Sequence, residues 1–173
     1  MNVDEAKLRM ELAAKQIRNP SLQNFTLEVL SRLPKRAWQR EASLKYHHPD
    51  EQEEGGNVLH ELRVVALSNL IAEVCNLQPQ DKNLLKAASL LHDCCRHGLD
   101  ADENYTVKVH ANLVREFIEE QGIESMWTNP VCTIIETHMS RWGEPSYTPQ
   151  ISLRDILVLA DYIASNPSVR VQE

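Results

Sequence analysis

Glycine and long apolar runs are both scarce in this sequence. Only five of the 173 residues are glycine, and long stretches of good helix formers lie between the breakers. No apolar run approaches the roughly 20 residues that a membrane-spanning helix needs. The N-terminal segment alternates charged and apolar residues and lacks the apolar core of a secretory signal peptide. We therefore expect an all-α protein that does not enter a membrane.

Cysteine is also sparse, and its spacing is uninformative for cross-linking. The four cysteines are Cys75, Cys94, Cys95 and Cys132. Two are adjacent and none forms a CxxC pair, so the sequence indicates neither a disulfide framework nor a zinc finger. This usage favours a reduced, cytoplasmic setting.

Positive charge is in deficit. The chain has 18 Lys and Arg against 25 Asp and Glu, which gives a formal net charge of −7. A surface of this sign is not expected to bind duplex nucleic acid through a basic face. Local basic groups in a cleft can still hold a small anionic substrate.

The length and composition suit one domain. Hydrophobic residues make up 42% of the chain and charged residues 25%, which is ordinary for a soluble globular protein with a sizeable core. We expect residues 1–45 to form an N-terminal helical segment packed on the same domain and residues 46–173 to form the core. Periodicity and breakers predict helices over about 3–18 and 22–33, from 58 onward, from a cap at Asp81 to Gly98, along 110–121 and 131–138, and after a cap at Ser152.

Six ionisable residues fall on the apolar faces of these predicted helices. They are His60, His92, Asp93, His110, His138 and Asp161. Burying polar or charged groups costs free energy unless something compensates them. A histidine taken alone is more often a hydrogen-bonded core residue than a ligand, but six such groups pointing into one core can be compensated together by a bound metal ion. The pattern therefore predicts a metal-dependent hydrolase.

The same residues resemble the HD-domain superfamily of metal-dependent phosphohydrolases, in its six-ligand form H…HD…H…H…D. His60 stands in GGNVLHELRVV, His92-Asp93 in ASLLHDCCRHG and Asp161 in VLADYIAS, while His110 and His138 stand between them. The preceding KYHHPDEQEEGG looks like the loop that often leads into the first histidine of this superfamily. The resemblance implies a helical bundle around a buried metal site.

The resemblance also implies a ligand set. His60, His92, Asp93 and Asp161 would bind a first divalent ion, and Asp93, with two oxygens, would bridge to a second ion held by His110 and His138. Mn, Fe, Zn, Ni, Co and Mg all remain open. So does a form with one metal, in which His110 or His138 contacts substrate instead.

The chemistry implied by this family is attack of metal-bound hydroxide on phosphorus. Arg96 lies one helical turn after Asp93, where many HD enzymes carry Lys or Glu. An arginine can clamp phosphate but is too basic to donate a proton readily, which leaves Glu61, His97 or a metal-bound water as the acid. Lys108 and Arg141 are further candidates for substrate contact. His47 and His48 are expected in a polar loop near the mouth, and Trp142 and Tyr147 at its rim.

The expected function is hydrolysis of a phosphoester or phosphoanhydride in a nucleotide or similar small phosphorylated compound. Two alternatives stay open at this point. One is a di-iron oxygenase resembling inositol oxygenase, and the other is a non-catalytic nucleotide-binding module. The amphipathic N-terminal helix can pack on its own domain or on a twin, so a homo-oligomer is also possible.

Overall fold

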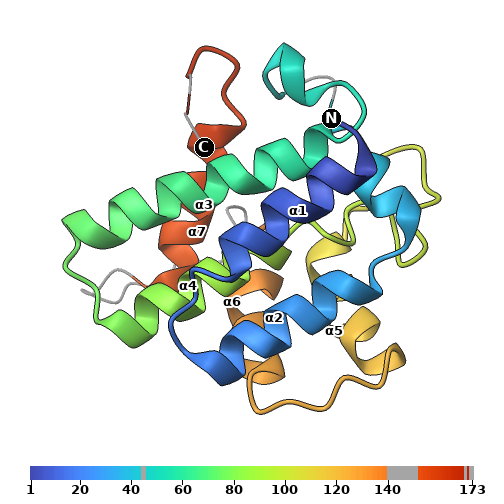
Figure 1. Cartoon of the computed structure of the whole chain (residues 1–173). Helices are drawn as coiled ribbons and strands as arrows, with labels where there is room; N and C mark the ends of the chain where they lie inside the picture. Colours follow the sequence, from blue (N-terminus) through green and yellow to red (C-terminus); the bar gives the residue numbers. More distant parts are fainter. Residues whose placement is uncertain (44–45, 140–151, 170, 172–173) are drawn as a thin grey trace.

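The described part of the chain consists of helices joined by turns and loops. A computed structural model describes residues 1–43, 46–139, 152–169 and 171, and within these residues there is no strand (Figure 1). The elements are α1 (Val3–Ala14), α2 (Pro20–Arg32), the 3₁₀ turns η1 (Lys35–Gln39) and η2 (Pro49–Glu51), α3 (Gly56–Val74), α4 (Pro79–Leu91), α5 (His110–Glu120), α6 (Thr128–Glu136) and α7 (Leu153–Ala164). The all-α prediction is confirmed. Among the described residues, no helix has both the length and the apolar character required to cross a membrane.

Side-chain caps explain where several helices begin. The Asn19 side chain accepts a hydrogen bond from the Leu22 backbone N–H just before Pro20 opens α2. Ser152 caps α7, as the sequence predicts, and forms a capping box with Asp155. The predicted cap at Asp81 is wrong. Helix α4 already begins at Pro79, whose fixed φ suits a first helical position, and Asp81 lies in its first turn.

The end of α4 also differs from the prediction. The helix ends at Leu91 with His92 as its C-cap, and turns carry the chain on to Gly98. Gly98 has a φ of +87°, a left-handed conformation that glycine adopts at little cost. The apolar pattern continues past the end of the helix because residues 92–97 are buried. Likewise α1 ends at Ala14, before the predicted residue 18.

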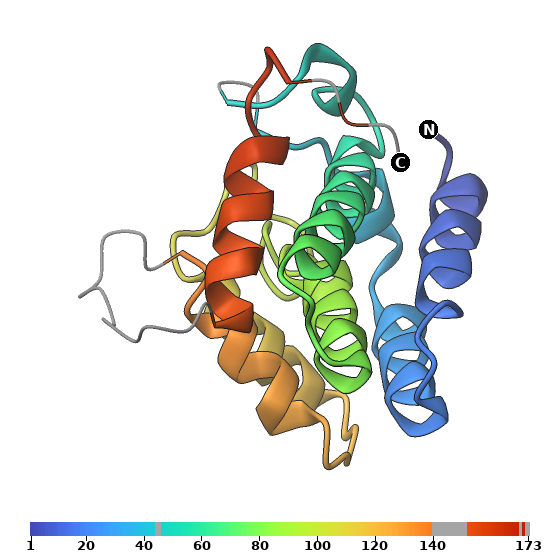
Figure 2. The same ribbon diagram turned by 90° about the vertical axis from the view of Figure 1, so that its left-hand side faces the viewer.

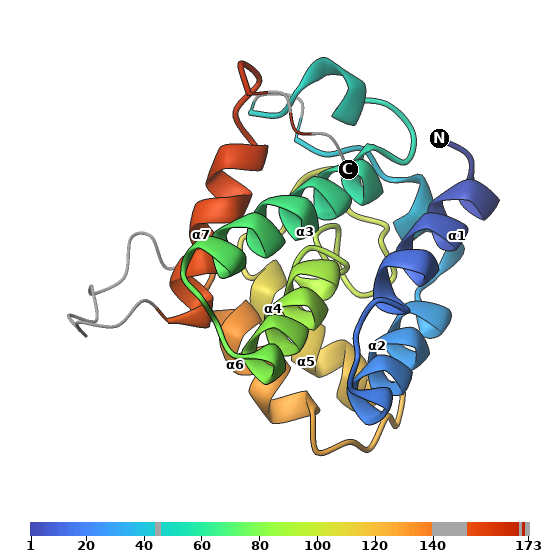
Figure 3. The same cartoon turned by 60° about the vertical axis from the view of Figure 1, so that its left-hand side comes forward.

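Helices α3 and α4 pack against each other at the centre of the molecule. In Figure 2, α7 covers one side of this pair, and α1 and α2 cover the opposite side. Helices α5 and α6 pack together beneath, with α6 against α4 (Figure 3). The N-terminal helices pack against the central pair, α1 on α3 and α4 and α2 on α4, and they share one hydrophobic core with the other described helices.

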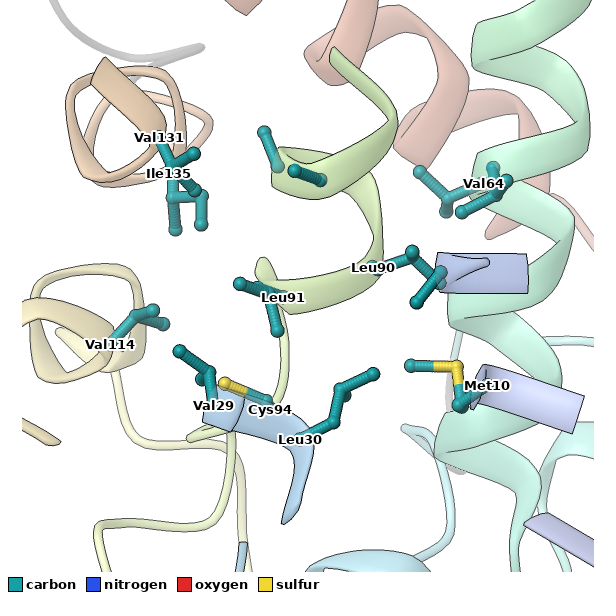
Figure 4. Close-up of a cluster of buried hydrophobic side chains, with 14 of the residues drawn as sticks. Met10, Val29, Leu30, Val64, Leu90, Leu91, Cys94, Val114, Val131 and Ile135 are labelled. Atoms are coloured by element: carbon teal, nitrogen blue, oxygen red, sulfur yellow. The ribbon is translucent and has the colours of Figure 1, made fainter. Parts of the chain in front are cut away.

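Leu90 and Leu91 of α4 lie in the middle of that core. Both are fully buried, and Figure 4 shows them among side chains contributed by the surrounding helices. These neighbours include Met10 of α1, Leu30 of α2, Val64 of α3, Val114 of α5 and Ile135 of α6. Burial of side chains of this size stabilises the fold by about 1.5–3 kcal/mol each. The core therefore fixes the C-terminal end of α4, where His92 and Asp93 follow.

Candidate metal centre

The structure brings the six ionisable residues together, mostly at helix ends. His60 lies within α3 and Asp161 within α7, but His92 caps α4 and Asp93 lies in the turn after it. His110 is the first residue of α5, and His138 lies two residues beyond the end of α6. The expectation that every one sits on the face of a helix is therefore wrong in detail. Four of the six come from the ends of α4, α5 and α6, which converge beside α3 and α7.

Asp93 is the centre of the group. Its Oδ2 lies 3.9 Å from His60 Nε2 and 3.8 Å from His92 Nε2. Its Oδ1 lies 2.9 Å from His110 Nε2 and 3.8 Å from His138 Nε2. The two oxygens thus face two different sets of imidazoles. Asp161 joins the first set, because its Oδ1 lies 3.1 Å from His60 Nε2.

Three of the histidines are held in one orientation by the backbone. Each places Nδ1 against the carbonyl oxygen three residues earlier: His92 on Ser89 at 2.9 Å, His110 on Val107 at 2.7 Å and His138 on Ile135 at 2.7 Å. A carbonyl oxygen can only accept, so Nδ1 carries the proton and Nε2 offers its lone pair to the site. Helix ends supply such unpaired carbonyls. Metal-binding histidines are commonly oriented in this way.

Several buried polar atoms here have no hydrogen-bond partner. They include His92 Nε2, His110 Nε2 and Asp93 Oδ1, and the 2.9 Å approach of the last two is not oriented as a hydrogen bond. Two groups of ligand atoms each lie within 4.8 Å of one another: His60, His92 and Asp161, and His92, Asp93 and His138. Imidazole nitrogen and carboxylate oxygen suit divalent transition metals. The residues present therefore fit a metal centre, and His92 belongs to both groups.

The electrostatic surroundings favour the metal-binding protonation state of Asp93, His92 and His138. Burial works to raise the pKa of Asp93, but His92, Arg96 and His110 hold it well below its usual range. Burial lowers the pKa of His92 to about 4 and also lowers that of His138. Both imidazoles are thus neutral near pH 7, as ligands must be. His60 and His110 differ. Burial works to lower the pKa of each, but Asp161 and Glu51 raise that of His60 to about 9, and the Asp93 carboxylate raises that of His110.

An open cavity of about 470 Å³ gives access to this group. Asp93, His110, His138 and Asp161 line it, whereas His60 and His92 lie behind them, fully buried. The volume falls in the range of sites for small ligands. The other described lining residues are mixed aromatic, apolar and polar: Tyr46, His47, Arg96, Thr106, Met139, Val158, Tyr162, Ser165, Asn166 and Pro167.

Arg96 lies on the cavity wall and is held by several neighbours. Its Nη1 donates to Asp93 Oδ2 at 2.9 Å, its Nε to Thr106 Oγ1 at 3.0 Å, and its Nη2 lies 3.2 Å from His47 Nε2. This guanidinium therefore orients Asp93 and places one positive charge beside the cavity. His47 is 4% exposed and lines the cavity, so it belongs to the site more closely than a loop residue at the mouth would.

Glu61 and His97 do not line the cavity. Glu61 is buried, and burial together with the charge of Asp93 raises its pKa well above the usual range. His97 places Nδ1 3.0 Å from the Glu103 carbonyl and Nε2 3.2 Å from that of Glu41. Both ring nitrogens thus have backbone partners. The prediction that one of these residues protonates a leaving group gains no support from this geometry.

The predicted substrate contacts divide in the same way. Lys108 is exposed and does not line the cavity. Arg141, Trp142 and Tyr147 lie outside the described residues.

Glu51 is a site residue that the sequence reasoning did not single out. It is fully buried, and its Oε2 lies 2.8 Å from His47 Nδ1 and 3.6 Å from His60 Nδ1. It stands in the acidic run DEQEE, which is typical of a solvated loop.

The opposed pKa shifts of His60 and His92 predict how the stability of the metal-free protein depends on pH. His92 resists protonation in the fold, so stability is lost as pH falls from about 6.5 toward 4. His60 is protonated more readily in the fold, so its contribution is complete below about 6.5 and is lost as pH rises through about 9. Each limb is worth about 3 kcal/mol. Urea unfolding of chelator-treated protein at pH 4.5, 6.5 and 9 should show a maximum near 6.5. An unfolding free energy that does not change with pH would contradict this prediction. In a His92→Gln variant, the unfolding free energy should fall less steeply at acid pH.

The chain belongs to the HD domain family, whose model matches residues 58–166. The match begins in the first turns of α3 and continues past the end of α7, and it spans all six candidate ligands. Searches of curated proteins and of solved structures found no match. The resemblance drawn from the motif is thereby confirmed, and membership in a superfamily of metal-dependent hydrolases follows from it.

Proposed function

We propose that this protein is a phosphohydrolase that depends on two divalent metal ions and cleaves a phosphoester or phosphoanhydride of a nucleotide or similar small phosphorylated compound. The observation that carries the proposal is the position of Asp93 at the open cavity, with each of its oxygens facing a separate set of imidazoles. Bound divalent ions lower the pKa of water and neutralise phosphoryl charge.

The chain's own residues have separable roles in this proposal. His60, His92, Asp93 and Asp161 would hold the first ion, and Asp93, His110 and His138 the second. Arg96 fixes the Asp93 carboxylate and adds positive charge on the wall where a phosphoryl group would lie. Apolar and aromatic side chains on the same cavity, such as Tyr46, Val158 and Tyr162, offer a surface for the rest of the substrate.

Metal analysis paired with an activity screen tests the proposal. Protein purified without chelators should contain about two divalent ions per chain. It should release inorganic phosphate from some members of a panel of nucleotides and sugar phosphates when Mn²⁺ is supplied. Removing the metal with a chelator should abolish release, and adding Mn²⁺ back should restore it. Tightly held iron with oxygen uptake and no phosphate release would overturn the proposal in favour of oxygenase chemistry. Nucleotide binding with neither reaction would indicate a non-catalytic module.

A further inference from the structure

Glu51 lies outside the six-residue group, yet it is one of the most enclosed carboxylates described in the chain. It has no exposed surface, and aspartate or glutamate is rarely buried to this extent without partners. Its Oε1 lies 2.5 Å from Nη1 of Arg63. Its Oε2 faces two imidazoles, His47 Nδ1 at 2.8 Å and His60 Nδ1 at 3.6 Å.

The backbone around Glu51 is also held in place by close contacts. The Glu51 carbonyl accepts a hydrogen bond from the Ala42 N–H at 2.8 Å. Gly56, at the start of α3, approaches it so closely that a Cβ there would lie 1.8 Å from the Glu51 carbonyl oxygen. Only glycine permits this approach. The loop before α3 is thus clamped to the helix that carries His60.

A metal ion between His47, Glu51 and His60 is the obvious alternative, because their ligand atoms lie within 4.8 Å of one another. The neighbouring charges argue against it. Arg63 already lies against the Glu51 carboxylate, and the Arg96 guanidinium, which can only donate, lies on His47 Nε2. His47 must then carry its proton on Nδ1 and donate it to Glu51. The Glu51 carboxylate and the His47 imidazole therefore already have partners, and no further metal ion is needed between them.

His60 is the partner that remains. Its Nδ1 is buried and makes no hydrogen bond at 3.6 Å, while its Nε2 points toward Asp161 and Asp93. A histidine that ligates through Nε2 has its proton on Nδ1 and usually donates it to a carboxylate or carbonyl. The other three imidazoles have backbone carbonyls for this purpose. For His60 the Glu51 carboxylate occupies that place.

We infer that Glu51 is the positioning residue of the metal centre: when His60 binds the metal through Nε2, Glu51 would accept its Nδ1 proton, and through His47 it also fixes Arg96 beside Asp93. This inference rests on the proposed metal site. A continuous series of contacts supports it, from Asp93 to Arg96 at 2.9 Å, to His47 at 3.2 Å, to Glu51 at 2.8 Å and to His60 at 3.6 Å.

Titration of chelator-treated protein with Co²⁺ alone, followed by its visible absorption, tests the inference. A Glu51→Gln variant should bind Co²⁺ about 10- to 100-fold more weakly than the wild type, with an altered spectrum because His60 is less firmly oriented. Asp50→Asn is the matched control. Asp50 also pairs with Arg63, at 2.7 Å, but it is not among the carboxylates described beside His60, which are Glu51, Asp93 and Asp161. This variant should therefore bind Co²⁺ within about twofold of the wild type.

The outcomes separate the two hypotheses. If Glu51→Gln binds Co²⁺ like the wild type, or if Asp50→Asn weakens binding equally, Glu51 has no positioning role although the metal site stands. If the wild type itself binds no Co²⁺, the proposed function fails first and the inference with it. Should Glu51→Gln not fold, the double variant Glu51→Gln/Arg63→Gln leaves no unpaired buried charge and is compared with Arg63→Gln in the same titration.

Discussion

An Asp93→Asn variant is expected to lose bound divalent metal and to hydrolyse phosphate substrates at least about a thousandfold more slowly. Asp93 is the residue whose two oxygens face both sets of imidazoles, with His92 on one side and His110 on the other. An amide offers one neutral oxygen where the carboxylate offers two charged ones, so it cannot serve both sets. A thousandfold loss corresponds to about 4 kcal/mol of transition-state stabilisation, which is the scale of metal-ion catalysis.

The comparison for this variant is Asp81→Asn, the same chemical change on the helix that leads to Asp93. Asp81 lies in the first turn of α4, at the opposite end of this helix from His92, and the variant should keep both metal content and activity. Metal content is measured on each protein after purification without chelators, and phosphate release is measured with added Mn²⁺. An Asp93→Asn protein that retains its metal and a tenth or more of the activity would contradict the central role of this carboxylate.

The sequence predicted the helical architecture well because helix periodicity is a local signal. The helix that carries His60 and the cap at Ser152 were both predicted from neighbours a few residues apart. Periodicity was less successful at helix ends. Residues 92–97 are buried after α4 has ended, so their apolar pattern looks like a continued helix, and the turn that aims Asp93 at the cavity could not be seen.

The site was predicted only as far as its ligands carry their own chemical signal. Histidine and aspartate in apolar surroundings indicate a buried centre whatever their local structure. Glu51 gave no such signal, because it stands in an acidic run beside Asp50 and near Glu53, where solvent exposure is the usual outcome. Its burial depends on Arg63 and on the close approach of Gly56. These are contacts of the folded chain, which composition does not reveal.

A His110→Gln/His138→Gln double variant is expected to bind one divalent ion per chain where the wild type binds two. These imidazoles lie on the Oδ1 side of Asp93, at 2.9 and 3.8 Å. The ligand group of His60, His92 and Asp161 on the other side is left intact. The rate of hydrolysis should fall by about a hundredfold, which corresponds to about 3 kcal/mol of transition-state stabilisation. One ion would still activate water, but stabilisation of the leaving oxygen by a second ion would be lost.

Metal stoichiometry decides between this account and a centre with one metal. If His110 and His138 contact substrate instead, wild type and double variant will both bind one ion, and the loss will appear in KM as well as in kcat. His48→Gln is the control, since His48 contacts the exposed Asp50 and does not line the cavity. It should leave both stoichiometry and rate unchanged. A double variant that still binds two ions would contradict the assignment of these histidines. The second ion would then have to be held by ligands from elsewhere in the chain.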